Sequence, residues 1–553
     1  MTYEIQNESY LLRKIKGWHI FILITICTLV PYFESVNGDF VFDDIPLIVT
    51  DPFYTAETNP LQCWNRSFWK ESRQQGLYRP VTILTYWVNV KVHGLKSAGF
   101  RLVNIILHIG VCILAYLLAR RLMAGKAAAV VAALIFAVHP IHSEAVAPAF
   151  GRGELLCAFF FMAGLLFHIR AGRSRFYLIP AATAFLLSCW SKEHAVVFLP
   201  VCIMMDLYLG RLGTSPFKNF AATLRKLRYC WIYVLVLAIY FASRLIVLGT
   251  FLPAKDNFEP GIDNPIAVVS PALRFVSALR IQGNAIKLLL WPDTLSHDYS
   301  FAQIRPSVSF ADPGAIVTLA LFIFLPFLLA KFIPRMKRKI IFFWCTYLIC
   351  ILPAGNFIVS AGTIFAERLI YLPSLWIILL FSCILMDLFR RFKSKIPVFI
   401  IIALLISACA ARSFVRIKDW NSEMSLAVAG IKTAPSSAKI WNNLAIQLET
   451  IGNLEEAVSA CDKAIGIYPR YATAWANRGT YLARLGRFEE AEHDLRYAIS
   501  LHKKHIQAYY NLGALLANLG RIEEAKAVWE KSLENAPDQP ELRKELLKLK
   551  GKK

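Results

Sequence analysis

The chain has 553 residues and a formal net charge of +23, because 61 lysines and arginines outnumber 38 aspartates and glutamates. Hydrophobic residues make up 56% of the chain and charged residues 18%, and the mean hydropathy is +0.47. Soluble domains are about 25% charged. The composition therefore excludes a disordered chain and argues against an ordinary soluble enzyme. Excess positive charge accompanies nucleic-acid binding, but in membrane proteins it collects in cytoplasmic loops. The positions of the lysines and arginines along the chain distinguish these two explanations.

Eleven apolar segments have about the 17–25 residues needed to cross a bilayer. They lie near residues 17–33, 100–119, 127–146, 154–169, 176–190, 194–209, 230–248, 314–333, 340–354, 369–389 and 396–415. Segment 274–291 also has a helical pattern, but it carries Arg274, Arg280 and Lys287. A charge costs about 3 kcal/mol at the bilayer centre. We therefore expect this segment to be an amphipathic helix at the outer membrane surface.

The loops between these segments alternate in charge. Lysine and arginine, with almost no acid, fill the loops at 120–126, 170–175, 211–228, 331–339 and 390–395, whereas the other loops hold the aspartates and glutamates. The positive-inside rule makes the first set cytoplasmic. This places the amino terminus inside and the carboxyl terminus outside. The excess of lysine and arginine is then explained by membrane topology, so we expect the lipid bilayer as a partner and no nucleic acid.

The composition changes near residue 416, and a repeat with a period of 34 residues follows. It is marked by Trp441, Trp475 and Tyr509, by Gly452, Gly486 and Gly520, and by Ala457, Ala491 and Ala525. This is the period of tetratricopeptide repeats, which are helix pairs stacked into a solenoid. We predict an all-α protein with a polytopic membrane domain at 1–416, including a long first outer loop at 34–99. A repeat domain at 417–553 follows, with repeats at about 438–471, 472–505 and 506–539.

The twelve cysteines form no CxxC pair, and most lie in apolar runs. This pattern predicts small buried apolar side chains rather than a zinc site or a disulfide framework. Cys63 and Cys461 lie in more polar stretches, and we expect these two to be accessible to solvent.

Ionisable residues collect at the predicted outer membrane surface, several of them at the ends of spans. They are Asp43, Asp44, Arg79, His139, His142, Glu144, Arg152, Glu154, Lys192, Glu193, Glu367 and Arg368. Each has a simpler interpretation. The two aspartates could cap a helix, the histidines with Glu144 could bind a metal although Pro140 interrupts them, and the cations could extend to the interface. Together they favour a site for an anionic, lipid-borne substrate.

The order of several motifs is specific. The chain contains GDFVFDD, YRPVTILTYWVN, HPIHSEAV with GRGELL, SKEH, LLLWPDTLSHDYSF, PAGNF with AERLIYLPS, and DWNSEMSL. In this order they resemble the transmembrane and tetratricopeptide-repeat O-mannosyltransferases, which are integral-membrane glycosyltransferases of the GT-C fold. The resemblance implies a polyprenyl-phosphate-linked mannose as donor and Ser or Thr of exported proteins as acceptor. Only three full repeats are present, fewer than in the eukaryotic members, which suggests a short bacterial relative that uses an undecaprenyl-phosphate sugar.

The residue types suit this chemistry. The donor is a phosphodiester with one negative charge, and its phosphate leaves as a monoester with more. The cations that could stabilise this growing charge are Arg79, Arg152, Lys192 and Arg368. Asp43 or Asp44 would then deprotonate the acceptor hydroxyl. His139, His142, Glu144, Glu154, Glu193 and Glu367 are further candidates for the site, and we expect no metal and no cofactor.

Asn443, Asn477 and Asn511 recur at the repeat period, so they predict a row of amides that binds the backbone of an acceptor. Their alternative role is to bond neighbouring turns. Two other functions stay open for the whole chain. One is a non-catalytic membrane-anchored scaffold, and the other is a lipid-linked oligosaccharide ligase or polymerase.

Overall fold

The computed structural model describes residues 16–69, 76–123, 125–213, 223, 225–251, 260–360, 362–391, 394, 396–537 and 539–550. Parts of the predicted loops at 34–99, 211–228 and 390–395 lie outside these ranges. Every regular element within them is helical. The chain divides into two compact units. A membrane unit comprises residues 1–258, 269–297 and 306–423, and a repeat unit comprises residues 259–268, 298–305 and 424–553.

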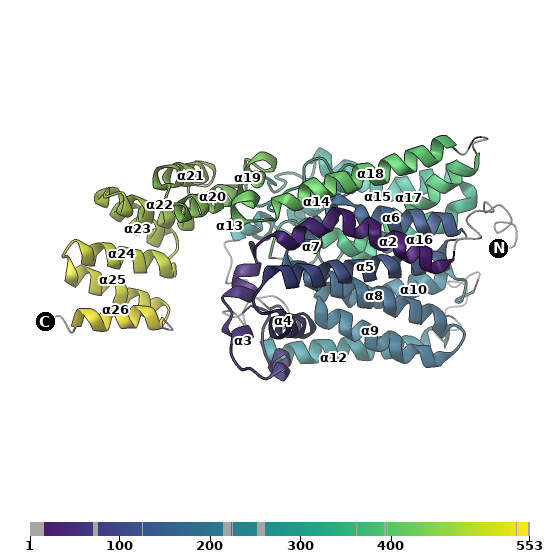
Figure 1. Ribbon diagram of the computed structural model, residues 1–553, viewed down its shortest axis with the longest axis horizontal. Coiled ribbons are helices and arrows are strands. Elements are labelled where there is room, and N and C mark those ends of the chain that lie inside the picture. The colour runs from purple at the N-terminus through teal and green to yellow at the C-terminus, as the bar shows by residue number, and fades with distance from the viewer. Residues whose placement is uncertain are drawn as a thin grey trace. The chain divides into compact units, whose positions relative to one another are not determined.

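The membrane unit is a bundle of helices that pack side by side (Figure 1). Its longer helices are α2 (Gly17–Tyr32), α4 (Pro80–His93), α5 (Ser97–Leu122), α6 (Lys126–Val138), α8 (Arg152–Ala171), α9 (Leu178–Ser191), α10 (Phe198–Tyr208), α12 (Trp231–Leu248), α14 (Pro271–Leu290), α15 (Pro313–Phe332), α16 (Lys337–Ile351), α17 (Tyr371–Arg391) and α18 (Ile396–Asp419). The short helices α3 (Pro52–Thr55) and α7 (Ser143–Val146) lie in outer segments of the chain.

A helix occupies each of the eleven segments that the sequence predicts to span the membrane. Among the described residues, seven helices are long and apolar enough to cross by themselves, and an eighth crossing results if α6 and Pro140–Val146, bent by 50° between them, count as one span. The helices α9, α10 and α16 have 14, 11 and 15 residues, which is short for a bilayer. The protein is therefore a polytopic membrane protein, and the count of eleven stays a prediction.

Helix α14 forms where the sequence predicts an amphipathic helix, and it is not among the described helices that are long and apolar enough to cross a membrane. Ser270 caps its start by accepting a hydrogen bond from the Leu273 N–H at 3.4 Å. Its apolar face packs on α15, where Val276 and Leu279 meet Ala315. Arg280 pairs with Asp312 at 3.1 Å, so the charge that opposes a membrane crossing is neutralised beside the next helix.

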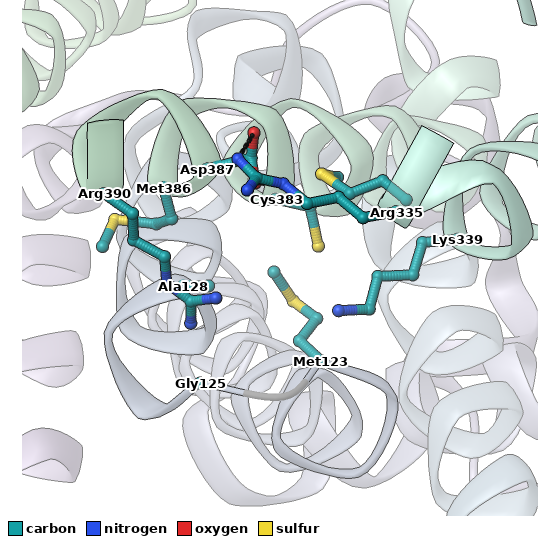
Figure 2. A pocket seen from close by; sticks show the side chains of 10 residues that line it. Met123, Gly125, Ala128, Arg335, Lys339, Cys383, Met386, Asp387 and Arg390 are labelled. Carbon is teal, nitrogen blue, oxygen red and sulfur yellow. Dashed lines mark hydrogen bonds and ion pairs between the residues drawn. The ribbon is translucent and has the colours of Figure 1, made fainter. Parts of the chain in front are cut away.

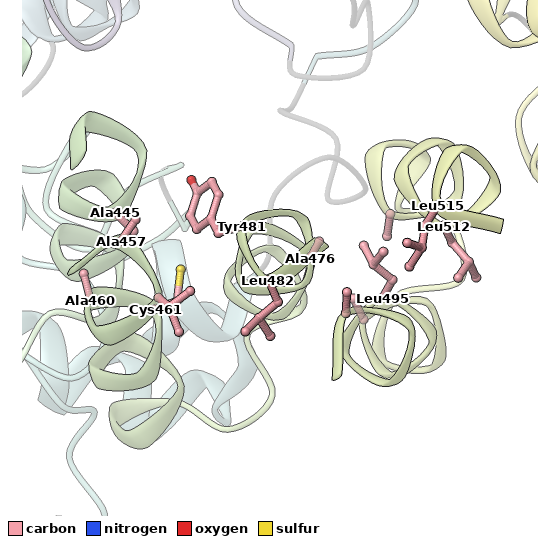
Figure 3. Packing of buried hydrophobic residues seen from close by; sticks show 14 of the residues in the cluster. Ala445, Ala457, Ala460, Cys461, Ala476, Tyr481, Leu482, Leu495, Leu512 and Leu515 are labelled. Atoms are coloured by element: carbon pink, nitrogen blue, oxygen red, sulfur yellow. The ribbon is translucent and has the colours of Figure 1, made fainter. Parts of the chain in front are cut away.

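The repeat unit consists of paired antiparallel helices. They are α20 (Ala438–Thr450), α21 (Leu454–Ile467), α22 (Ala472–Arg484), α23 (Phe488–Leu501), α24 (Ile506–Asn518), α25 (Ile522–Asn535) and α26 (Pro540–Lys550). Small residues such as Ala457, Ala491 and Ala525 are fully buried and let the helices approach closely. Figure 3 shows part of the resulting core, to which Leu482 of α22, Leu495 of α23 and Leu512 of α24 contribute. Helix α19 (Glu423–Thr433) precedes the repeats.

Two earlier segments of the chain belong to the repeat unit. Helix α13 (Pro260–Asp263) and residues 298–305 pack against its first helices, where Ile262 is buried beside Ala438 and Tyr471. The Ala438 N–H donates to the Phe301 carbonyl at 2.9 Å, and Lys439 pairs with Asp263 at 2.6 Å. These segments thus pack on the first helices of the repeat unit and extend its core.

The cysteines are free, and the two expected to reach solvent do not. Cys63 and Cys461 are both completely buried, so that expectation is wrong. Cys461 lies in the repeat core between α21 and α22, and burial raises its pKa to about 12. The polar residues around Cys461 suggested an exposed position. In an amphipathic helix, however, buried and exposed positions alternate every few residues, so a buried side chain can have polar neighbours in the sequence.

One glycine recurs in each repeat because the turn between the two helices requires a positive φ angle. Gly452, Gly486 and Gly520 join the two helices of each pair with φ angles of 82°, 80° and 78°. We expect Gly486→Ala to destabilise the repeat unit by about 1–2 kcal/mol, because an L side chain is strained in this conformation. Gly466, inside α21 with no atom within 4 Å of an added Cβ, is the matched control, and Gly466→Ala should stabilise by about 0.5–1 kcal/mol. Thermal unfolding followed by circular dichroism measures both, and equal effects would contradict the prediction.

Candidate functional site

Three cations at one end of the membrane unit each pair with a carboxylate. Arg79 pairs with Glu193, Lys192 with Glu154, and Arg368 with Glu144. The partners come from α8, from the turn after α9, from α7 and from the segments before α4 and α17, which are far apart in the sequence. The structure thus brings together six of the residues that the sequence singles out.

Arg79 and Glu193 form a bidentate pair. The Arg79 Nε donates to Glu193 Oε2 at 2.9 Å, and a terminal nitrogen donates to Oε1 at 2.6 Å. The guanidinium also lies over the Phe68 ring, 4.7 Å from its centre. Burial opposes the charge of both groups, but each partner outweighs it, so the pKa of Arg79 is raised and the pKa of Glu193 is held well below its usual range.

Lys192 lies in the turn between α9 and the 3₁₀ helix Glu193–Val197, and it donates to Glu154 at the start of α8. His194 approaches the other oxygen of Glu154 at 3.7 Å. Burial lowers the pKa of Lys192, Glu154 opposes this change, and Arg79 and Arg368 are close enough to lower the pKa further. The three cations therefore act on one another electrostatically and form one cluster.

Arg368 is shared between two carboxylates. It donates to Glu144, which is fully buried and also accepts the Arg368 backbone N–H at 2.9 Å, and a second terminal nitrogen lies 3.6 Å from Asp43. Its guanidinium stacks over the Phe150 ring at 5.0 Å. Asp43 keeps 25% of its side chain exposed and Arg368 keeps 18%. This contact is therefore longer and more exposed than the one between Arg368 and Glu144.

Asp44 has a different environment from its neighbour. It is fully buried, and its carboxylate accepts the backbone N–H groups of Phe150 at 2.7 Å and of Ala149 and Val41 at 3.2 Å. Burial raises the pKa of Asp44 to about 6, and Arg101 and the three N–H groups limit the rise. Asp44 therefore fastens the first outer loop to the turn before α8.

Arg152 is enclosed in a network of its own. Its guanidinium is completely buried, donates to Asn104 and Asn89 and to the carbonyls of Thr85 and Phe100 at 2.9–3.2 Å, and stacks on the Tyr86 ring. All these partners are neutral, so a positive charge is held without a carboxylate. The side chain ties α8 to α4 and α5, and the structure does not bring it to the three ion pairs.

The remaining candidates also hold neighbouring segments. His139 bonds the Leu289 carbonyl at 2.9 Å, and His142 bonds the Phe136 carbonyl and Ser374. Glu367 accepts the Ser296 N–H at 2.6 Å and lies 3.8 Å from Arg416. Among the described residues, no group of three His, Cys, Asp or Glu side chains could hold a metal ion.

Sequence reasoning missed Arg101, Arg416 and His194. Arg101 is fully buried and donates to the carbonyls of Ser35, Asp39 and Trp420. Arg416 is equally buried and pairs with Asp419 at 2.9 Å. Arg101 lies near the start of α5 and Arg416 near the end of α18, so each adjoins a long apolar run, and this is the signal that could have found them.

In the repeat unit, two of the three recurring asparagines bond between repeats. The Asn477 amide donates to Asn442 at 2.9 Å, and the Asn511 amide donates to Thr480 at 2.7 Å. These bonds favour the architectural interpretation for both. Asn443 is half-buried, and its side chain makes no hydrogen bond among the described residues.

Comparison with known proteins agrees with this architecture. The family model "Protein O-mannosyl-transferase TMTC, DUF1736" matches residues 256–326, and two tetratricopeptide-repeat models match residues 438–471 and 482–548. A protein O-mannosyl-transferase of Caenorhabditis elegans is 32% identical over 461 residues, which cover 82% of this chain and 63% of the relative. The human protein O-mannosyl-transferase TMTC3 is 28% identical, with 81% and 51% covered. The chain thus spans between half and two thirds of the length of these relatives.

Among solved structures, the oligosaccharyltransferase of Archaeoglobus fulgidus, tethered with an acceptor peptide, is 14% identical. The match covers 78% of this chain and 57% of that one, with a TM-score of 0.40.

The bundle with paired charges at one end and the attached repeats define a polytopic membrane protein with a tetratricopeptide-repeat domain. Among such proteins the chain is similar to protein O-mannosyl-transferases, which agrees with the resemblance in its motifs.

The buried Asp44 predicts a pH dependence of stability. Its pKa is about 6 in the folded protein against 3.8 ordinarily, so the folded state binds this proton more tightly between these values. The contribution of Asp44 to stability is greatest below about pH 4 and falls as the pH rises to about 6, by at most about 3 kcal/mol. We expect Asp44→Asn to remove this fall when unfolding is measured from pH 4 to 7. Asp39→Asn, which removes an exposed carboxyl group from the same loop, is the control, and identical profiles for the two variants would contradict the prediction.

Proposed function

We propose that this protein transfers mannose from a polyprenyl phosphate to Ser or Thr hydroxyl groups of exported proteins. The observation that carries the proposal is the contact between Asp43 and Arg368. A partly exposed carboxylate, which can act as a base, lies there beside a partly exposed cation of the three ion pairs. The names of the relatives support the same activity. The GT-C architecture implied by the motifs belongs to this proposal.

The reaction is a single displacement. The acceptor oxygen forms a bond to C1 of the sugar while the bond between C1 and the phosphate oxygen breaks, and the phosphate monoester leaves with the electron pair. The hydroxyl proton goes to the Asp43 carboxylate. Attack on the face opposite the leaving group inverts the configuration at C1. A lipid monophosphate donor needs no nucleotide loop.

The charges of the cluster suggest how the donor binds. Asp43, Glu144, Glu154 and Glu193 outnumber the cations Arg79, Lys192 and Arg368 by one, so a phosphate gains a cation only by displacing a carboxylate. The weakest of these contacts is the one between Arg368 and Asp43, at 3.6 Å. A donor phosphate that takes over this arm of Arg368 displaces the Asp43 carboxylate from the guanidinium, and Asp43 then acts as the base. Binding of the donor and activation of the base are then one event.

Asp43 suits the role of base better than Asp44. The Asp44 carboxylate is buried and already accepts three backbone N–H groups, so no acceptor hydroxyl can reach it without opening the loop. Asp43 has a quarter of its side chain exposed. Asp44 then acts indirectly, by holding the loop that carries Asp43.

We expect Asp43→Asn to lower transfer by about 10²–10⁴-fold with an unchanged melting temperature, because one general base is removed. Mass spectrometry of exported proteins from cells that carry each variant gives the measurement. Asp39→Asn, the same change at an exposed position of the same loop, should keep wild-type glycosylation. Full glycosylation by Asp43→Asn would exclude Asp43 as the base.

The same spectra separate the alternative functions. A mass shift of one hexose supports the transferase, a long glycan would support an oligosaccharide ligase, and no shift in any strain would support a non-catalytic scaffold.

The protein's orientation is part of the proposal. The positive-inside pattern supports a repeat unit outside the cytoplasm, in the periplasm of a bacterial inner membrane or in the endoplasmic reticulum lumen of a eukaryote. We expect a protease added to the cytoplasmic side of sealed vesicles to leave residues 424–537 intact. Cleavage there before the membrane is opened would reverse the orientation.

The repeats offer a route to acceptor capture. Asn443 is the best candidate for this role, because the side-chain amides of Asn477 and Asn511 donate hydrogen bonds to neighbouring repeats. An amide both donates and accepts, so Asn443 can hold a peptide backbone without selecting its side chains.

We expect Asn443→Ala to reduce glycosylation at low acceptor concentration and to leave the melting temperature unchanged. Asn477→Ala should instead lower the melting temperature, since it removes a bond of about 0.5–1.5 kcal/mol between repeats. Unchanged glycosylation by Asn443→Ala would leave all three asparagines as architecture.

A further inference from the structure

A cavity of about 180 Å³ lies among the positive loops of the membrane unit. The segment between α5 and α6, the 3₁₀ helix Pro334–Met336 before α16, and the last turns of α17 enclose it. None of its lining residues belongs to the three ion pairs of the candidate site. Figure 2 shows Lys339 and Arg390 directing their charged ends into the opening from different sides.

One wall of the cavity carries a fixed positive charge. Arg335 is held by the buried carboxylate of Asp387, with Nε 2.7 Å from one oxygen and a terminal nitrogen 2.8 Å from the other. Arg391 reaches the same carboxylate at 2.9 Å. Asp387 is therefore already neutralised by two arginines, and Lys339 and Arg390 add positive charge to the lining. The lining is positive overall.

The floor of the cavity is apolar and soft. Met123, Met336, Cys383 and Met386 line it, and three of these side chains are methionines, which adapt to an irregular partner. The volume is below the roughly 300–1,000 Å³ of sites for whole small molecules. It suits one phosphate group with a short apolar attachment. A free anion gains nothing from an apolar floor.

We propose that this cavity binds the headgroup phosphate of an anionic phospholipid in the adjacent leaflet. It opens where the apolar helices α5 and α17 end in arginines, which is the level of lipid headgroups. Basic pockets between membrane helices at this level bind such headgroups. The phosphate lies between Lys339, Arg390 and Arg335, and the beginning of an acyl chain meets the methionines. This site is independent of the transfer reaction.

The test uses the full chain in phosphatidylcholine nanodiscs with added phosphatidylglycerol, and native mass spectrometry measures the bound lipid. We expect the double variant Lys339→Gln/Arg390→Gln to bind phosphatidylglycerol about 30-fold more weakly, since each cation near the surface contributes about 1 kcal/mol. The control Arg173→Gln/Arg175→Gln removes two exposed arginines from another positive loop and should bind as the wild type does.

A second variant keeps the charges and fills the space. Ala128→Leu adds atoms to the cavity wall, so it should weaken phosphatidylglycerol binding as well. Melting temperatures verify that each variant is folded. Equal losses in the two double variants would mean general surface attraction and overturn the proposal, as would unchanged binding in Lys339→Gln/Arg390→Gln. Displacement of the lipid by millimolar inorganic phosphate would assign the cavity to a free anion instead.

Discussion

Arg368 is the side chain on which the candidate site depends. A carboxylate beside a buried guanidinium offsets the cost of burying its charge, and Arg368 has two, Glu144 and Asp43. The contact with buried Glu144 fixes the position of the guanidinium. The contact with Asp43 is longer and partly exposed, which is why we propose that a ligand replaces it. One residue thus connects the first outer loop, α7 and the segment before α17.

Other buried charges position this site without belonging to it. Asp44 accepts the N–H groups of the turn before α8, Arg101 donates to carbonyls of the first outer loop, and Arg152 ties α8 to α4 and α5. Each binds backbone or neutral amide groups, so it replaces the solvation that burial removes. These charges are costly at this depth, and their effect is to hold irregular segments in one arrangement. The ion pairs of the cluster need such support because their partners come from five separate segments.

The sequence by itself determined the class of the protein and its plan. Apolar length and one-sided charge predicted a helical membrane unit, since a bilayer permits little else. The period of 34 residues predicted the repeats, because each stacked helix pair needs the same small residues and the same turn glycine. Gly452, Gly486 and Gly520 adopt the left-handed conformation that this turn requires. Motif order led to the family, and the charged residues of the outer loops included every member of the three ion pairs.

Only the tertiary structure decided what each of these residues contacts. Spacing cannot separate Asp43 from Asp44, since neighbours in an irregular loop point in directions that the fold alone sets. Sequence reasoning grouped Arg152 with the other cations of the outer surface, whereas in the structure neutral groups surround Arg152. It missed the segments 259–268 and 298–305 that join the repeat unit, and the burial of Cys63 and Cys461. These outcomes depend on contacts between residues far apart in the chain, and a local pattern carries no information about such contacts.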